Sequence, residues 1–99
     1  MLINTLTQQV ALEICNEWKS ITMANANTRF IVIFNAKKMA GYEPMARITF
    51  QRTISELKGQ IEKIWLVTDS KVISSGAAII SMLTSIPIKA IDSESKIVV

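Results

Sequence analysis

The side chains that most often carry catalysis are scarce in this sequence. It contains no histidine, which excludes a serine–histidine or cysteine–histidine pair and an imidazole metal ligand. Among the eight carboxylates, Glu13 and Glu17 lie four residues apart, but on the polar side of a predicted helix, where a solvated surface is the better interpretation. The single cysteine, Cys15, lies beside an apolar stripe and is interpreted as a buried small hydrophobe. We therefore expect no enzyme activity, no metal site and no cofactor.

Polar residues also cluster where an apolar run leads into a predicted helix. Asp69, Ser70 and Lys71 occupy this junction, and a small polar stretch follows at 74–76. Backbone N–H groups at a helix start can bind an anion, and ligands of open α/β sheets lie beyond the carboxyl ends of the strands. Capping of the helix by Asp69 or Ser70 explains the same residues without a ligand, and no glycine-rich phosphate-binding pattern is present. We favour the cap and keep an anion contact at Asp69, Ser70 and Lys71 as the alternative.

A third group of polar side chains surrounds the loop at residues 37–43. This group consists of Lys37, Lys38, Tyr42, Glu43 and Arg47. Together with residues 69–71, these side chains are predicted to line one edge of the sheet. We call these five residues the rim and interpret them as a binding surface for a partner protein. The alternative is that Tyr42 and Met39 only cover the core and that Arg47 forms an ion pair with Glu43.

The composition describes one small domain over residues 1–99 with an excess of apolar residues. Apolar residues make up 49% and charged residues 19%, against about 25% charged in an average soluble domain. The net charge of +3 is scattered along the chain, so we expect no nucleic-acid-binding face. No apolar run approaches the roughly 20 residues that cross a bilayer, and no signal peptide is recognised, so we expect cytoplasmic residence without membrane insertion. The surplus apolar surface indicates either a sheet covered on both faces or contact with another chain.

Apolar spacing predicts the elements that would position these groups. Residues 5–24 carry an apolar residue at every fourth position, which is typical of an amphipathic helix, and Thr5 with Gln8 fits a capping box at its start. The run 30–34 is continuously β-branched and aromatic, which predicts a strand covered on both faces. Residues 37–43 are then predicted to form a loop.

The second half of the chain repeats helix and strand. Pro44 is suited to the first turn of a helix over residues 44–58, because its missing N–H is not needed there. Residues 64–67 predict a second buried strand, residues 71–84 a third helix and residues 88–91 a last strand at a sheet edge. This alternation is typical of an α/β fold, here with three mainly parallel strands in a small sheet flanked by helices.

The segment at residues 31–47, IVIFNAKKMAGYEPMAR, resembles a known family. It is similar to the strand–loop–helix turn of STAS-type domains, the fold of bacterial anti-sigma-factor antagonists. In that family an acidic residue ends the strand and an Asp-Ser pair opens the helix; here Asn35 and Glu43-Pro44 stand at those places. The closer resemblance is to an uncharacterised STAS-like branch, whose pattern matches Gly41-Tyr42-Glu43-Pro44 and Ala46-Arg47.

Two departures from the STAS pattern matter. Pro44 stands where the family carries its phosphoacceptor and has no hydroxyl, so the family's phosphorylation switch is not expected here. Members also usually begin with two strands before the first helix and end with a further helix. In this chain residues 1–4 precede the first predicted helix, and residues 93–99 are too short to assign. Missing strands would leave the sheet edge uncovered, which favours self-association.

Helix 71–84 is apolar around nearly its whole circumference, which is typical of a helix buried on both sides. In a domain this small the second cover is expected to come from another chain, so we expect a homodimer through this helix or the sheet edge. The resulting hypothesis is a non-enzymatic STAS-like protein-interaction or regulatory domain. The alternative is a small-molecule or lipid-binding module with an apolar pocket beside helix 71–84. A third hypothesis is an anion- or nucleotide-binding domain that uses the carboxyl ends of the strands.

Overall fold

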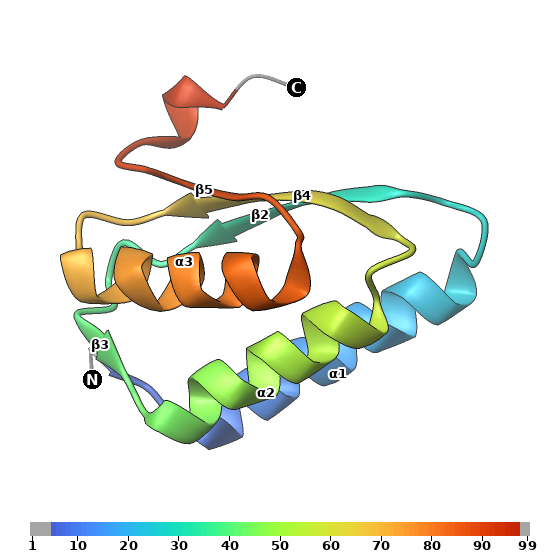
Figure 1. The fold of residues 1–99 in the computed structure, drawn as a ribbon, viewed down its shortest axis with the longest axis horizontal. Helices are drawn as coiled ribbons and strands as arrows, with labels where there is room; N and C mark the ends of the chain where they lie inside the picture. The colour runs from blue at the N-terminus through green and yellow to red at the C-terminus, as the bar shows by residue number, and fades with distance from the viewer. Residues whose placement is uncertain (1–4, 98–99) are drawn as a thin grey trace.

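Helices and strands alternate along the chain in the computed structural model, which describes residues 5–97 (Figure 1). The helices are α1 (Gln8–Ala24), α2 (Pro44–Glu56) and α3 (Lys71–Thr84). The longer strands are β2 (Phe30–Asn35), β4 (Ile61–Val67) and β5 (Ile88–Ile91), the short ones are β1 (Thr5–Leu6) and β3 (Gly41–Tyr42), and Glu94–Lys96 forms a 3-10 turn. The predicted α/β class is confirmed. Residues 98 and 99, part of the stretch that the sequence leaves unassigned, lie outside the described residues.

The three longer strands form a small parallel sheet in the order β2-β4-β5. β4 is central, and its Trp65 is the register partner of Ile33 on β2 and of Lys89 on β5. β5 is therefore an edge strand, as predicted, and β2 is the other edge. The short strands β1 and β3 form a separate parallel pair, with Thr5 opposite Gly41.

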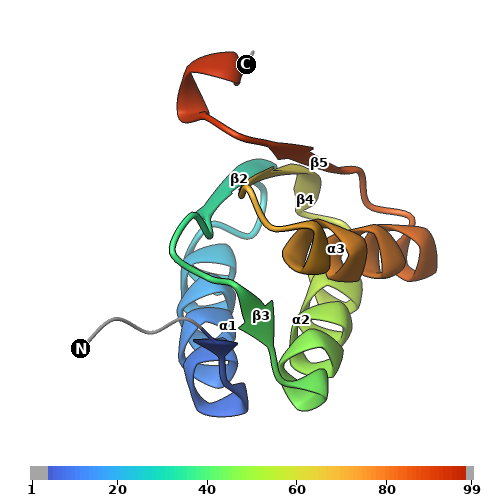
Figure 2. The ribbon, with the colours of Figure 1, turned by 90° about the vertical axis from the view of Figure 1, so that its left-hand side faces the viewer.

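All three helices lie on one face of the larger sheet (Figure 1, Figure 2). The crossovers β2–α2–β4 and β4–α3–β5 step in the same direction across the sheet, so the usual right-handed connection puts both helices on the same side. On the opposite face of β2, the side chains of Ile31 and Ile33 are exposed. The prediction that the run 30–34 is covered on both faces is therefore wrong. β2 alternates between half-buried and exposed residues, because no helix covers its second face.

α1 begins later than the apolar spacing predicts. Thr7 caps the helix, its hydroxyl accepting a hydrogen bond from the Val10 N–H at 3.3 Å. The predicted capping box of Thr5 and Gln8 is wrong, because the backbone ahead of Thr7 pairs with β3 instead of joining the helix. Residues 1–4, which stand where the STAS family has two strands, lie outside the described residues.

α2 and α3 begin where the sequence predicts. Pro44 opens α2, and the helix ends at Glu56, two residues before the predicted end. The Ser70 hydroxyl caps α3 by accepting a hydrogen bond from the Ile73 N–H at 3.3 Å. α3 spans the predicted residues and is followed by Ser85 in the left-handed conformation, with φ of 61°. Local sequence features, Pro44 in the first turn of α2 and the Ser70 cap of α3, therefore mark the starts of both helices that frame the candidate site.

Three aromatic rings join the helices to the sheet inside the core. The ring centroid of Trp18 on α1 lies 6.2 Å from that of Phe34 on β2 and 5.5 Å from that of Phe50 on α2. Phe34 and Phe50 are also 5.5 Å apart and meet edge to face. Such aromatic pairs contribute about 0.5–1.5 kcal/mol each beyond the burial of their area. Cys15 on α1 is buried, which confirms its interpretation as a buried small residue.

Candidate functional site

The predicted anion-contact residues and part of the rim meet at the carboxyl ends of β2 and β4. Lys37 Nζ lies 2.9 Å from Asp69 Oδ2, in an exposed ion pair that links the two loops. Ser70 caps α3 and also donates a hydrogen bond from its Oγ to the Ala40 carbonyl at 3.4 Å. Lys38 is exposed. Ser70 rather than Asp69 is the helix cap, because α3 begins at Lys71 and Ser70 directly precedes it. The Asp69 carboxylate is paired with Lys37 instead.

A shallow hollow beside the start of α3 carries balanced charge. Its walls include Asp69, Lys71, Asp92 and Lys96. Lys96 Nζ lies 2.7 Å from Asp92 Oδ1, and this hydrogen bond and the lysine's charge hold the pKa of Asp92 below its usual range. Two carboxylates and two ammonium groups leave no net positive charge in the hollow. The structure therefore adds no support for an anion contact at Lys71.

The remaining rim residues do not form one surface. Glu43 Oε1 accepts a hydrogen bond from the Gln8 N–H at 2.8 Å, and the Glu43 N–H donates to the Leu6 carbonyl at 2.9 Å. Arg47 Nη1 donates to Gln51 Oε1 at 3.1 Å. Within residues 5–97 the ion pair expected as an alternative between Glu43 and Arg47 is not formed. The reason is that Glu43 serves as a second cap at the start of α1.

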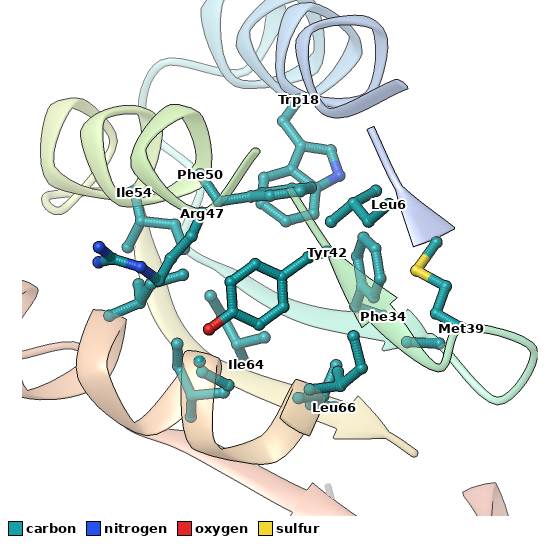
Figure 3. Close-up of a pocket in the computed structure, with 16 residues that line it drawn as sticks. Leu6, Trp18, Phe34, Met39, Tyr42, Arg47, Phe50, Ile54, Ile64 and Leu66 are labelled. Carbon is teal, nitrogen blue, oxygen red and sulfur yellow. The ribbon is translucent and has the colours of Figure 1, made fainter. Parts of the chain in front are cut away.

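Tyr42 and Arg47 instead help to line an apolar cavity of about 80 Å³ between the sheet and the helices (Figure 3). Side chains from both short strands, all three helices and all three longer strands contribute to its walls. Among the described lining residues only Arg47 carries a charge. The cavity lies beside α3, where the sequence places an apolar pocket as an alternative.

Gly76 makes room for Tyr42 at the cavity. A Cβ atom built at Gly76 on α3 would lie 2.7–2.9 Å from the outer ring atoms of Tyr42, closer than side chains approach one another. By sequence, Gly76 belongs with the polar stretch 74–76 near a helix start. The structure places Gly76 in the cavity wall, buried, with the Tyr42 ring against it. Tyr42 thus covers the core, as the alternative for the rim predicts.

The apolar walls of the cavity are not identified by the sequence. Trp18, Phe34, Phe50 and Ile54 line it, but their spacing marks them only as members of buried faces. No sequence signal separates an apolar residue that packs against a neighbour from one that borders a void. The sequence feature that indicates a pocket is the apolar excess of helix 71–84. It predicts that the pocket lies beside this helix but does not identify the residues that line it.

A second candidate feature is the side of α3 that points away from the sheet. Val72, Ile79, Met82 and Leu83 are exposed there, and we call these four residues the outward face of α3. Their spacing of three, four and seven residues puts them on one side of the helix. Lys71 is the single charged residue in the sequence of α3. The second cover expected for this helix is therefore not supplied by the described part of the chain.

The open face of the sheet carries Trp65 beneath two lysines. The ammonium groups of Lys63 and Lys89 lie 4.1 and 5.6 Å from the Trp65 ring centroid, in a cation–π arrangement. Only 3% of Trp65 is exposed, and its indole N–H has no hydrogen-bond partner among the described residues. The exposed side chains of Ile31 and Ile33 lie on the adjoining strand. This face combines apolar and basic side chains, but its aromatic ring is closed to a ligand.

Neither a metal site nor a membrane span is found in residues 5–97. No group of three or more His, Cys, Asp or Glu side chains in this part of the chain is placed to hold a metal ion. No helix within it combines the length and the apolar character that crossing a membrane requires. Comparison of the chain with protein-family models, with curated proteins and with solved structures finds no match. The outward face of α3 and the cavity are therefore the features of the described residues that bear on function.

Proposed function

We propose that this chain is a non-enzymatic protein-interaction domain that pairs with a second copy through the outward face of α3. The observation that carries the proposal is the exposure of four large apolar side chains on one side of a helix whose other side is buried. Contiguous exposed apolar patches on soluble proteins often mark interaction surfaces. A STAS-like regulatory role is part of the same proposal and rests on the resemblance of residues 31–47.

An antiparallel pair of α3 helices fits the charge of this surface. The exposed apolar positions recur at the spacing of a helix–helix seam. Lys71 lies in the first turn of α3, so an antiparallel pair places its ammonium beside the carbonyl end of the other copy's helix. The helix dipole favours a cation there by about 0.3–1 kcal/mol. A parallel pair would instead bring the two lysines together, so we propose the antiparallel dimer.

Analytical ultracentrifugation of the Met82→Glu variant tests this pairing. The wild-type chain is expected to sediment as a dimer at high concentration, and the variant as a monomer, because the contact would bury a carboxylate without a partner. The matched control is Met23→Glu on α1, since Met23 is 80% exposed and Met82 is 75% exposed. A monomeric wild type, or equal dissociation by both substitutions, overturns the proposal. A dimer that survives Met82→Glu would move the contact to the open sheet edge and also overturn it.

A second function, binding of a small apolar molecule, is favoured by the cavity beside α3. An apolar cavity of about 150 Å³ in another protein stays dry and binds benzene or xenon. The cavity here is smaller, about 80 Å³, and the surface that lines it is apolar. Such a space suits xenon or a short hydrocarbon chain.

Methyl NMR spectra recorded under xenon pressure test the second function. The methyl groups of Ile64 and Ile80, which line the cavity, are expected to show saturable shifts in the wild-type protein. Ala77→Leu is expected to abolish the shifts, because Ala77 lines the cavity and the larger side chain fills it. Ala78→Leu, at the exposed neighbouring position, is the control that keeps them. A wild-type spectrum without saturable shifts, or an unchanged response in Ala77→Leu, refutes binding in this cavity.

A further inference from the structure

The face of the larger sheet that no helix covers is apolar on one strand and basic on the other two. On β2 the side chains of Ile31 and Ile33 are exposed there. Lys63 of β4 is the register partner of Ile31, and Lys89 of β5 lies beside Ile33 with only Trp65 between them. Residues in register point to the same face of a sheet, so the two lysines and the two isoleucines share this face. We call Ile31, Ile33, Lys63 and Lys89 the open-face patch.

The two lysines of the patch carry charge that no carboxylate within residues 5–97 neutralises. The three ion pairs of this part of the chain are formed by other lysines, and Glu62, the residue before Lys63, takes part in none of them. The ammonium groups of Lys63 and Lys89 lie over the indole ring between them, at 4.1 and 5.6 Å from its centroid. Glu94 lies at the carboxyl end of β2, where it accepts a hydrogen bond from Asn35 at 3.3 Å. The open-face patch is therefore complementary to an anionic partner.

A single helix matches the shape of this face. Parallel sheets are usually covered by helices on both faces, and here all three helices of the described residues lie on one (Figure 1). Neighbouring strands lie about 4.8 Å apart, so the three strands span about 10 Å, close to the diameter of one helix. A helix packed along the strands would place an apolar stripe on Ile31 and Ile33. The side next to that stripe would face the two lysines and would carry carboxylates.

Two other occupants fit the patch less well. A second copy of the chain, packed face to face, would bring the lysines of the two patches into one interface, and like charges there oppose association. An anionic lipid surface is bound by clusters of about four to eight basic residues, whereas the patch holds Lys63 and Lys89. The charge and the width of the face together favour a protein helix.

We propose that the open-face patch binds an acidic amphipathic helix of a partner protein. Glutamates three or four residues apart on that helix lie on one side of it, so two of them face Lys63 and Lys89 while the apolar stripe covers Ile31 and Ile33. This surface lies across the sheet from the outward face of α3 (Figure 1), so the inference goes beyond the pairing proposed above and does not depend on it.

Fluorescence anisotropy with two designed helical peptides tests the inference. Both peptides carry the same leucine stripe, and the side next to the stripe carries glutamates in one peptide and glutamines in the other. The wild-type protein is expected to bind the glutamate peptide at least about tenfold more tightly, the gain that a hydrogen bond between charged groups supplies. The double variant Lys63→Gln/Lys89→Gln is expected to bind the two peptides equally. Ile33→Thr is expected to weaken both peptides alike, because it removes apolar contact and no charge.

The matched control is the double variant Arg52→Gln/Lys58→Gln. It removes the same charge from exposed positions outside the patch and is expected to keep the preference for the glutamate peptide. Equal affinity of the wild type for the two peptides overturns the inference. An equal loss of preference in both double variants also overturns it, because the effect would then be one of net charge. Should Lys63→Gln/Lys89→Gln not fold by circular dichroism, Lys89→Gln alone replaces it with a smaller loss of the same preference.

Two further measurements separate this inference from its alternatives. In cosedimentation with vesicles of phosphatidylcholine and phosphatidylserine, the wild type is expected to stay in solution. Vesicle binding without a preference for the glutamate peptide assigns the patch to a lipid surface and overturns the inference. Sedimentation of Lys63→Gln/Lys89→Gln is expected to match that of the wild type, since pairing through α3 uses other residues. A monomeric wild type that prefers the glutamate peptide supports the inference while it overturns the pairing.

Discussion

The wall of the cavity depends on the contact between Gly76 and the Tyr42 ring. Gly76→Ala is expected to lower the free energy of unfolding by about 1 kcal/mol, because overpacking costs about 1–3 kcal/mol and the gain in helix propensity offsets about 1 kcal/mol of it. In a Tyr42→Ala background the same substitution is expected to stabilise by up to about 1 kcal/mol, since only the propensity gain is left. Urea unfolding of the four proteins in this double-mutant cycle measures the difference. An effect of Gly76→Ala that is the same in both backgrounds contradicts the contact.

The thiol of Cys15 is shielded by its position on α1. It is 1% exposed, and burial raises the pKa of the thiol, an effect that a hydrogen bond with Thr53 and the charge of Lys19 only partly oppose. The thiolate is the reactive form, so native protein is expected to react with iodoacetamide far more slowly than protein unfolded in urea. Mass spectrometry of the adduct over time checks this. Equal rates in the two states would contradict burial.

The same thiol sets the sign of a pH effect. Its folded pKa lies above its unfolded value, because burial disfavours the thiolate. The contribution of the thiol to stability is therefore fully present below the unfolded pKa and is lost as the pH rises through the folded pKa. The effect belongs to the alkaline range and leaves stability at neutral pH unchanged.

The start of α1 depends on the side chain of Glu43, the residue that joins β3 to α2. Glu43 Oε1 accepts from the Gln8 N–H at 2.8 Å, and Glu43 lies 35 residues further along the chain. Glu43→Ala is expected to lower the free energy of unfolding by about 1 kcal/mol, the usual effect of losing a helix cap. Glu43→Gln is expected to lose only about 0.5 kcal/mol, because it keeps an acceptor and loses the charge that the helix dipole favours.

Urea unfolding checks the Glu43 variants against Glu17→Ala. Glu17 is exposed on α1, and its substitution is expected to change the free energy of unfolding by less than about 0.5 kcal/mol. A Glu43→Ala variant as stable as Glu17→Ala would show that the cap does not hold α1 to the rest of the fold.

Pairing through the outward face of α3 would couple the stability of the whole molecule to its concentration. Binding that occurs only in the folded state raises the free energy of unfolding by about 2.7 kcal/mol at a hundredfold excess over Kd. The Tm of the wild-type protein is therefore expected to rise by several degrees when its concentration is raised a hundredfold. Met82→Glu is expected to keep a constant Tm over the same series. Scanning calorimetry measures the Tm of both proteins at each concentration. A wild-type Tm that stays constant contradicts pairing.

The order and type of the longer elements were determined by the sequence itself. Pro44 and Ser70 mark the starts of α2 and α3, and both act through backbone groups within one helical turn. Continuous apolar runs likewise locate β2 and β4, although β4 begins earlier, at Ile61. These features depend on neighbouring residues, so they can be recognised along the chain before any tertiary contact is known.

The tertiary structure alone decided which polar groups meet and where space is left. The pairing of β1 with β3 and the cap that Glu43 gives to α1 join segments far apart in the sequence. The second face of β2 is open because both crossover helices lie on the other side of the sheet. The apolar residues around the cavity have the same pattern whether they pack tightly or border a void. Whether such residues pack tightly or border a void depends on the distance between the helices and the sheet, and the packing of all the elements together sets that distance. For that reason the sequence indicates a pocket beside α3, and only the structure assigns Tyr42, Gly76 and Arg47 to it.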